Sequence, residues 1–388
     1  MTRTIYPKPD IFKRRKSVLD KIVSVAQRSW VHAPLQVTLA SAVILGSAFS
    51  FRSNQDPVFN DYNSIVKVVD HVTSLILTLC SLTSIYCLLN NVEPAYNFFK
   101  NLYPEGKGLF VPLIAIRKFH ILRNFLLCNL VIGSLITLNA SLYISTYGWY
   151  FYRGFVFRDV QFYVFNLVIL LLLTFARKIE LRFVEMNRLI VYDTEKYLKR
   201  NVVEAQTGDQ HFYSIKNFRK VHFELCELVE KFNEMFGRIL LVFILFIIAN
   251  ILENLTTVIE YVLLSNKDDG KRITRMYFFG LISFWILTNV GQAFLISFYG
   301  EFITREGKKT TKICFSLLNE LQGVARDDNE RLLKEELQLL ALQSSTRMPS
   351  LSAGGFFDIN FRVLGIIINT VTSYLIVITQ FLLNYRNW

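Results

Sequence analysis

The chain has 388 residues, of which 52% are hydrophobic, and it carries a formal net charge of +12. Several apolar runs reach the length of about 20 residues that a helix needs to cross a lipid bilayer. A strongly basic chain can bind nucleic acid, but here the Lys and Arg residues flank the apolar runs and form no separate soluble patch. Composition therefore argues against a soluble domain and a nucleic-acid partner, and it predicts a membrane protein.

Seven apolar runs are candidates for membrane-spanning segments. We expect each to be an α-helix, because a helix satisfies its backbone hydrogen bonds without water. In chain order they are His32–Phe51, Val68–Leu89, Ile121–Tyr147, Val160–Ala176, Phe236–Leu264, Thr274–Phe298 and Phe361–Leu383. The predicted fold is an all-α membrane protein with seven transmembrane helices, of which the fourth has the shortest apolar run.

The distribution of basic residues predicts which side of the membrane each connection occupies. Lys and Arg are dense in the N-terminal tail, after the second span, and in the stretches Arg177–Lys231 and Arg305–Arg347. The alternate connections are short and poorer in them, although Ser265–Ile273 holds three. Because basic connections remain in the cytoplasm, we expect a cytoplasmic N-terminus and, after seven spans, an extracellular C-terminus.

The long cytoplasmic connections have helical patterns of their own. Apolar residues recur at helical spacing in Lys178–Asn233, so spans four and five should continue into the cytoplasm as long helices. Glu330–Leu342 predicts a shorter amphipathic helix, and the Pro and Gly residues of Ser344–Gly355 predict a break after it. These helices could form an anchor region, or they could simply pack together beneath the membrane.

This pattern suggests three parts. They are a cytoplasmic tail (1–31), a six-helix ligand-sensing region with cytoplasmic extensions (32–329), and an anchor helix followed by the last span (330–388).

Motifs of enzymes and cofactor sites are absent from the sequence. No two of the five histidines are three or four residues apart, so no helical metal-binding pair is possible. The run Gly307–Thr310 is similar to the end of a phosphate-binding loop, but Phe302 stands where that loop requires glycine. We therefore expect no enzymatic activity, no cofactor and no metal site.

The last span carries a narrow polar seam. At about 100° per residue, one arc of the helix contains Asn369, Thr370, Ser373, Val377, Gln380 and Asn384. The remaining surface is mostly aliphatic and aromatic, so the seam should face other helices or water and not lipid. Two interpretations stay open, helix–helix hydrogen bonding and a pore lined by several subunits. Because the seam carries no charge, ion selectivity of such a pore would be loose.

The outer ends of spans three to six are rich in polar and aromatic residues, whereas their inner stretches are aliphatic. Such groups converging from four helices predict a cavity that is open to the outside and binds a small molecule. The candidate ligand-binding residues are Asn139, Tyr143, Phe162, Asn166, Glu253, Asn254, Tyr261, Trp285 and Asn289.

An aromatic belt at the membrane surface, combined with interhelical hydrogen bonds, is the alternative to a cavity. A belt does not account for Asn166, Glu253 or Asn289, which should lie deeper in the membrane. No clear basic partner for Glu253 is evident in the sequence.

The C-terminal region resembles the signature of insect gustatory receptors, which are related to insect odorant receptors. That signature is Thr-Tyr, five mostly hydrophobic residues, then Gln-Phe. The matching residues are Tyr374, Gln380 and Phe381. Ser373 takes the place of the usual Thr, and Thr379 is a polar member of the hydrophobic run. The pattern at Ser352–Phe357 and the layout of seven spans with an inside N-terminus also look like this family.

The resemblance implies a ligand-gated, non-selective cation channel in the plasma membrane. Family members assemble as tetramers, so the implied partners are membrane lipids, a tastant and identical or related receptor subunits. In the family the last helix lines the pore, cytoplasmic helices form a shared anchor, and tastants bind in the outward cavity of each subunit. Gln380 and Phe381 would then form the gate. A bitter compound is the default tastant, because sugar receptors are a small subset of the family.

Two other classes of seven-helix protein remain as alternatives. A G-protein-coupled receptor would have its N-terminus outside, and the chain lacks Asp-Arg-Tyr and Asn-Pro-x-x-Tyr patterns at the expected helix ends. A transporter would need intramembrane charge pairs or broken helices, and it would move substrate without channel-like current.

Epitope tags at both termini test the predicted orientation. In intact cells we expect antibody to label the C-terminal tag only, and to label the N-terminal tag after permeabilisation, because basic connections stay in the cytoplasm. Surface labelling of the N-terminal tag would rule out this topology and favour the G-protein-coupled receptor alternative.

Overall fold

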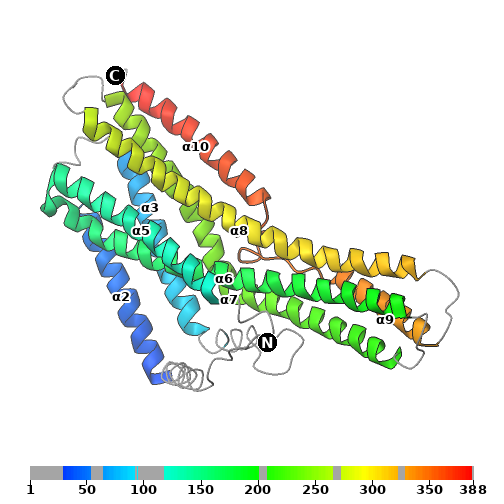
Figure 1. Ribbon diagram of the computed structural model, residues 1–388. Helices are drawn as coiled ribbons and strands as arrows, with labels where there is room; N and C mark the ends of the chain where they lie inside the picture. The colour runs from blue at the N-terminus through cyan, green and yellow to red at the C-terminus, as the bar shows by residue number, and fades with distance from the viewer. Residues whose placement is uncertain are drawn as a thin grey trace, which may run out of the picture.

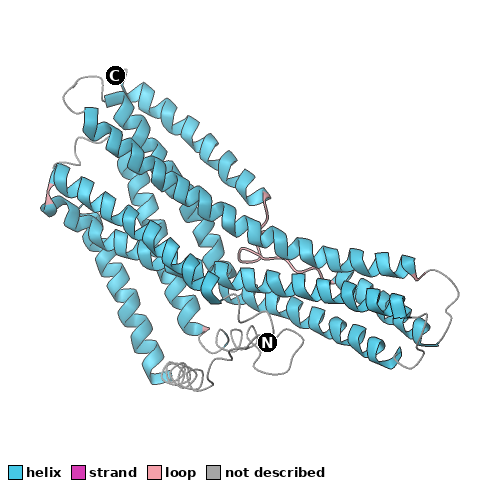
Figure 2. Ribbon diagram, in the orientation of Figure 1, coloured by secondary structure: helices cyan, strands magenta, loops and turns pink. Residues whose placement is uncertain are grey.

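In the computed structural model, the structure describes residues 29–53, 64–91, 94, 118–200, 208–264, 272–321 and 328–386. The predicted N-terminal tail therefore lies almost entirely outside the described residues. The described part is built from long helices without a strand (Figure 2). They are α2 (Ser29–Ser53), α3 (Ser64–Asn90), α5 (Lys118–Tyr147), α6 (Trp149–Arg200), α7 (Gly208–Leu264), α8 (Arg272–Glu320), α9 (Asp328–Thr346) and α10 (Arg362–Arg386).

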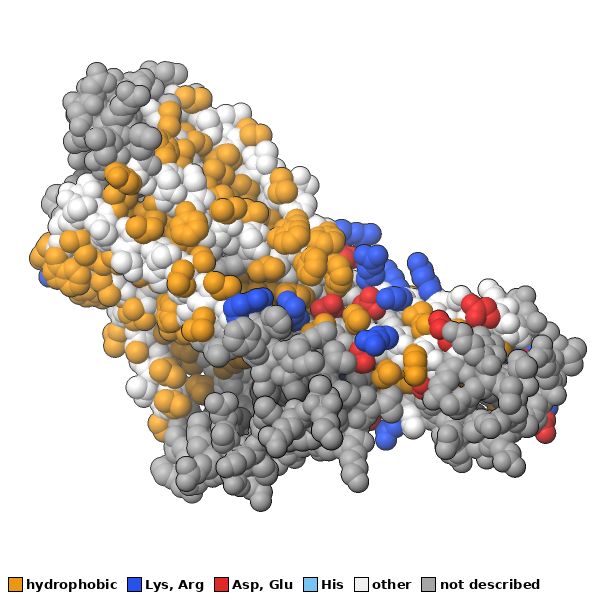
Figure 3. Space-filling model, viewed as in Figure 1, with side chains coloured by type: hydrophobic (Ala, Val, Ile, Leu, Met, Phe, Trp, Pro, Cys, Tyr) orange, Lys and Arg blue, Asp and Glu red, His pale blue; other side chains and the backbone are white. Residues whose placement is uncertain are grey.

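The molecule is elongated and has two parts (Figure 1). The first, which we call the apolar bundle, contains α2, α3, α5, α10 and the adjoining halves of α6, α7 and α8. The second, which we call the stalk, contains the other halves of those three helices together with α9. Hydrophobic side chains dominate the visible face of the apolar bundle, whereas Lys, Arg, Asp and Glu begin at its junction with the stalk (Figure 3). This change of surface is the one expected of a protein that leaves the membrane at the junction.

The predicted all-α fold with seven apolar helices is confirmed. Six helices of the described chain are long and apolar enough to cross a membrane, and Pro34–Ser50 in α2 is a shorter apolar helix. Spans four and five continue as long helices of 52 and 57 residues, as predicted. The third long helix was not anticipated, since α8 continues through the predicted end of span six at Phe298 to Glu320.

The short connection expected between spans three and four, Gly148–Asp159, is helical from Trp149 onward. Gly148 makes the turn alone with a φ of 84°, which is accessible to glycine, and α6 begins at Trp149. Arg158 and Asp159, at the end of this stretch, lie inside the helix, where hydrogen-bonding partners satisfy them.

Helix α7 is the centre of both parts. It packs against α3 and α10 in the apolar bundle, against α9 in the stalk, and against α6 and α8. Its fully buried side chains run from one part to the other, and they include Phe218, Phe232, Phe236, Phe243 and Phe246. Burial of such residues from end to end makes the two parts one continuous core.

Polar contacts, some between buried groups and one at the surface, connect the stalk helices. Asn187 on α6 donates from Nδ2 to Glu306 Oε2 on α8 at 3.0 Å, and Thr310 Oγ1 donates to Asn187 Oδ1 at 2.7 Å. Just beyond α9, Arg347 donates to both carboxylate oxygens of Glu230 at 3.0 and 2.6 Å. These hydrogen bonds to Glu230 raise the pKa of Arg347 above its ordinary value.

A short hairpin joins α9 to α10 and fills the junction of the two parts. Its two sides meet at an isolated bridge between Ser352 and Asp358, and its turn uses Gly354 and Gly355 at φ of 62° and 81°. Asn233 of α7 holds it through two bonds, accepting from Ser352 N at 2.9 Å and donating to Ser350 O at 2.8 Å.

Three helix glycines allow the hairpin to approach closely. A Cβ at Gly237 would press against the backbone at Gly354, one at Gly300 would overlap the carbonyl oxygen of Ile359, and one at Gly307 would overlap the ring of Pro349. The hairpin that carries the Ser352–Phe357 pattern is thus held closely against α7 and α8.

We expect Gly300→Ala to destabilise the protein by roughly 1–3 kcal/mol, the usual cost of overpacking, because rigid backbone occupies the position of the new methyl group. Gly291→Ala on the same helix is the control, since its Cβ meets open space and alanine is the better helix former by about 1 kcal/mol. The thermal midpoint of the detergent-solubilised protein measures both. Equal midpoints for the two variants would contradict the proposed close packing.

Candidate functional site

A cavity of about 80 Å³ opens within the apolar bundle, near the helix ends at Ser64, Trp149 and Leu264. Five helices contribute to it: α3, α5, α6, α7 and α8. The lining residues are Thr73, Leu77, Asn139, Tyr143, Arg158, Asp159, Phe162, Phe246, Asn250, Glu253, Asn254, Thr257, Phe278, Leu281, Ile282 and Trp285. The volume suits several water molecules or a compact organic molecule.

Most of the residues predicted to bind a ligand lie around this cavity. The residues in its lining are Asn139, Tyr143, Phe162, Glu253, Asn254 and Trp285. Asn166 and Asn289 are buried beside it and bond to other amides, and the side chain of Tyr261 is outside the described residues. That any of these predicted residues binds a ligand stays a prediction.

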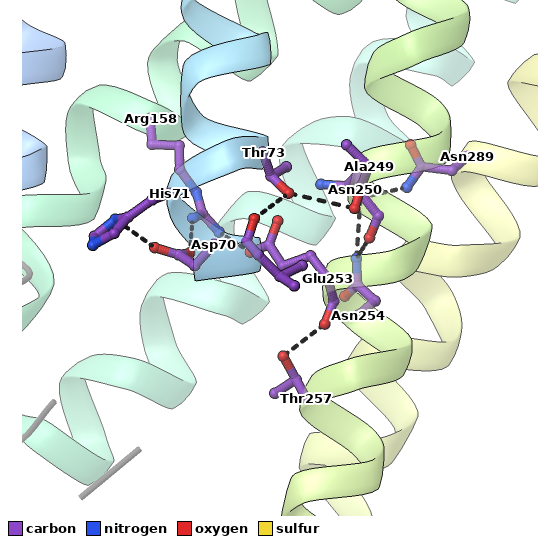
Figure 4. A network of polar contacts seen from close by, with 11 residues as sticks. Asp70, His71, Thr73, Arg158, Ala249, Asn250, Glu253, Asn254, Thr257 and Asn289 are labelled. Carbon is purple, nitrogen blue, oxygen red and sulfur yellow. Dashed lines mark hydrogen bonds and ion pairs between the residues drawn. The ribbon is translucent and has the colours of Figure 1, made fainter. Parts of the chain in front are cut away.

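An ionic group joins three helices at the edge of the cavity (Figure 4). Arg158 on α6 donates from Nη1 to Asp70 Oδ1 on α3 at 2.5 Å and from Nη2 to Glu253 Oε1 on α7 at 3.0 Å. Next to it on α6, Asp159 accepts a hydrogen bond from the hydroxyl of Tyr152 at 2.6 Å. The side chains of Asp70 and Glu253 are only 13% and 12% exposed, so these bonds form largely out of water.

The expectation that Glu253 has no basic partner was therefore wrong, and Asp70, Arg158 and Asp159 were missed. A signal was available. Asp70, Arg158 and Glu253 lie six, nine and eleven residues from Ser64, Trp149 and Leu264, which all lie at the same end of the bundle. At a rise of about 1.5 Å per residue these residues lie within about 8 Å of one another in depth, a difference that long side chains can bridge, but placing 148–159 in a connection between spans concealed the match.

A chain of amides continues from the cavity into the bundle. Asn254 donates to Asn250 Oδ1 at 3.0 Å within α7, and Asn289 of α8 donates to the same oxygen at 2.8 Å. Further along, Gln292 of α8 donates to Asn166 Oδ1 of α6 at 2.5 Å. These bonds link α6, α7 and α8 and pair polar groups that would otherwise be costly within a membrane.

Aromatic rings also line the cavity. The ring of Phe162 on α6 lies 4.7 Å from Trp285 on α8 and 6.0 Å from Phe246 on α7, in tilted arrangements. Tyr143 on α5 stacks on Phe155 of α6 at 5.6 Å. Apolar walls with a few fixed polar groups are the usual composition of a small-molecule site.

The polar seam lies on the outside of the single chain. Helix α10 buries Val363, Ile367 and Val371 and contacts α7 and α8. At about 100° per residue, the seam points roughly 110° away from that packed face. Accordingly Asn369, Ser373, Val377 and Gln380 are exposed and Thr370 is partly buried, while the side chain of Asn384 is outside the described residues. Phe381 beside the seam is 62% exposed.

A family model described as 7tm Chemosensory receptor matches residues 24–385, nearly the whole chain. The chain belongs to the seven-transmembrane chemosensory receptor family. This membership confirms the relationship to insect chemoreceptors indicated by the C-terminal motif. No curated protein matches the chain significantly.

Solved structures of an insect chemosensory receptor share the fold. The olfactory receptor OR5 of Machilis hrabei in complex with eugenol aligns with a TM-score of 0.59 and 12% identity over 95% of this chain and 98% of OR5. The OR5 structure described without that ligand aligns with a TM-score of 0.57 and 12% identity over 94% and 97%. At this identity the likeness establishes the fold of the chemosensory receptor and no more.

We expect Arg158→Met to destabilise this chemosensory receptor, because Asp70 and Glu253 would retain their charge without the guanidinium that bonds to both. Breaking a buried pair costs about 3–5 kcal/mol, and we expect about 3 kcal/mol or less because Arg158 is 26% exposed. Adding Asp70→Asn and Glu253→Gln should recover most of the loss. Thermal unfolding in detergent measures the change.

The control is Arg331→Met, which removes an exposed ion pair between Arg331 and Glu335 on the stalk helix α9. This variant should change stability by less than about 0.5 kcal/mol. A triple variant as unstable as Arg158→Met alone would show that charge pairing is not the reason for the loss.

Proposed function

We propose that this chemosensory receptor is a gustatory receptor that acts as a ligand-gated, non-selective cation channel in the plasma membrane. The observation that carries the proposal is the uncharged polar seam of α10, which is exposed in the single chain and points away from the face on which α10 packs. An exposed polar seam at membrane depth is costly in lipid. A water-filled pore between subunits removes that cost.

A pore lined by α10 requires several copies, because one helix cannot enclose it. We propose a homotetramer, or a heterotetramer with related receptors, in which Thr370, Ser373 and Val377 face the pore and Gln380 and Phe381 form its gate. The Tyr374, Gln380 and Phe381 matches to the gustatory receptor signature support this assignment. The N-terminus and the stalk would lie in the cytoplasm, where the stalk would form the shared anchor.

The proposed tastant site is the cavity of the apolar bundle. Its mixture of amides, charged groups and aromatic rings suits a small organic molecule, with a bitter compound as the default class. Olfactory receptor OR5 has been solved with eugenol, which supports a small-molecule ligand for a chain of this fold.

Helix α8 offers a direct mechanical connection between cavity and pore helix. It lines the cavity with Trp285, and nine residues later Phe294 packs against Phe361 just before α10, with ring centroids 6.2 Å apart. A ligand that displaces Trp285 would therefore move the segment from which α10 starts.

We expect Gln380→Ala and Phe381→Ala to raise the current measured in the absence of ligand. Burial of a Phe side chain at a closed gate is worth about 1.5–3 kcal/mol, and a loss of about 1.4 kcal/mol changes an equilibrium tenfold. The open fraction should then rise about tenfold or more. Whole-cell current or calcium recording, with and without a tastant panel, is the measurement.

Ile368→Ala is the matched control, because Ile368 is exposed on α10 but lies on the other side of the packed face from the seam. It should leave the current unchanged. If the basal and ligand-evoked currents of both gate variants equalled those of the unmodified receptor, the proposed gate would be wrong.

A further inference from the structure

The charged groups around the cavity do not balance. Arg158 is the one basic residue among the described lining residues, whereas Asp159 and Glu253 both line the cavity. Behind Arg158, Asp70 accepts from the same guanidinium. One guanidinium thus serves a group with three carboxyls. His71 lies beside Asp70, with its Nδ1 4.0 Å from Asp70 Oδ2, so at most two positive charges face the three carboxyls.

Glu253 has a carboxylate oxygen to which no described donor group bonds, and the group beside it is a second carboxyl, Asp70. Its Oε1 accepts the bond from Arg158, whereas its Oε2 is shielded from solvent and accepts no hydrogen bond from a donor group in the described structure. In Figure 4 the carboxylate lies between the Asp70–Arg158 side and the amides of Asn250 and Asn254. An unsatisfied buried oxygen costs about 1–3 kcal/mol, and more when it is charged, so a ligand that donates to it would relieve that cost.

The wall beside these carboxyls is suited to a positive charge. Phe162 and Trp285 form a tight ring pair, and Phe246 and Tyr143 extend it. The faces of aromatic rings carry partial negative charge and attract ammonium groups within about 6 Å. The carboxyl oxygens and the ring faces therefore both attract a positively charged ligand that lies between them.

From this arrangement we infer that the cavity selects an organic cation, either a protonated amine or a quaternary ammonium. Its positive nitrogen lies near Glu253 and Asp159, and its apolar part contacts Phe162 and Trp285. The volume of about 80 Å³ restricts it to a compact molecule. This inference rests on the proposed function in one respect, that the cavity is the tastant site.

Binding of two probes of equal shape tests the inference. The probes are benzyltrimethylammonium and neopentylbenzene, in which a neutral carbon replaces the ammonium nitrogen. Full-length receptor in phosphatidylcholine nanodiscs is titrated with each, with empty nanodiscs as the blank, and binding is followed calorimetrically. We expect the ammonium probe to bind at least tenfold more tightly.

Glu253→Gln and Asp159→Asn test the origin of that preference. Each preserves side-chain shape, and each should reduce the affinity for benzyltrimethylammonium severalfold or more while leaving that for neopentylbenzene unchanged. Glu234→Gln is the control, since Glu234 is on the same helix α7 but is exposed in the stalk. It should leave both affinities as they are.

Equal affinities for the two probes, binding of neither at millimolar concentration, or a cation preference that persists in both Glu253→Gln and Asp159→Asn would overturn the inference. Failure of the channel proposal is a separate result. It would appear as a receptor that binds the ammonium probe selectively but never gives a ligand-evoked current.

Discussion

The guanidinium of Arg158 is the group on which the polar end of the apolar bundle depends. A charge at this depth in a membrane protein is tolerated only where it is paired and faces the protein interior, and Arg158 meets both conditions through Asp70 on α3 and Glu253 on α7. The same two bonds connect α3, α6 and α7 beside the cavity. The ion pairs that make the buried charge of Arg158 tolerable also hold one side of the candidate site in place. The same interactions therefore stabilise the fold and shape the site.

At the junction of the apolar bundle with the stalk, the fold depends on close contact between backbones. Gly237, Gly300 and Gly307 let the hairpin before α10 lie directly on α7 and α8, where a side chain would hold it away. The hairpin thereby fixes where α10 starts, and with it the direction in which the polar seam points. Between these two ends, α7 and α8 run continuously from cavity to stalk, so a change of packing at Trp285 can reach α10 through covalently continuous helix.

Prediction from sequence succeeded where the relevant property is local. Apolar length identified every span, and helical spacing predicted the extensions of α6 and α7, because both depend on a few turns of one helix. It failed at the start of α6 and at the extension of α8. Span four was placed from Val160 onward, because the partners that let Arg158 and Asp159 lie inside the helix are on other segments or a turn away. The charged run Arg305–Lys309 was placed in a connection, because Asn187, the buried partner of Glu306, is distant in the chain.

By itself, the sequence determined that this protein is a multi-pass helical membrane protein whose last helix carries an uncharged polar seam, since hydrophobic length and angular spacing are properties of consecutive residues. Only the tertiary structure decided that Glu253 pairs with Arg158, that Asn166 and Asn289 bond to other amides and do not line the cavity, and that the seam is exposed. Those outcomes depend on which helix faces are brought together. The two amide hydrogen bonds between helices, for example, join residues that are 39 and 126 positions apart in the sequence.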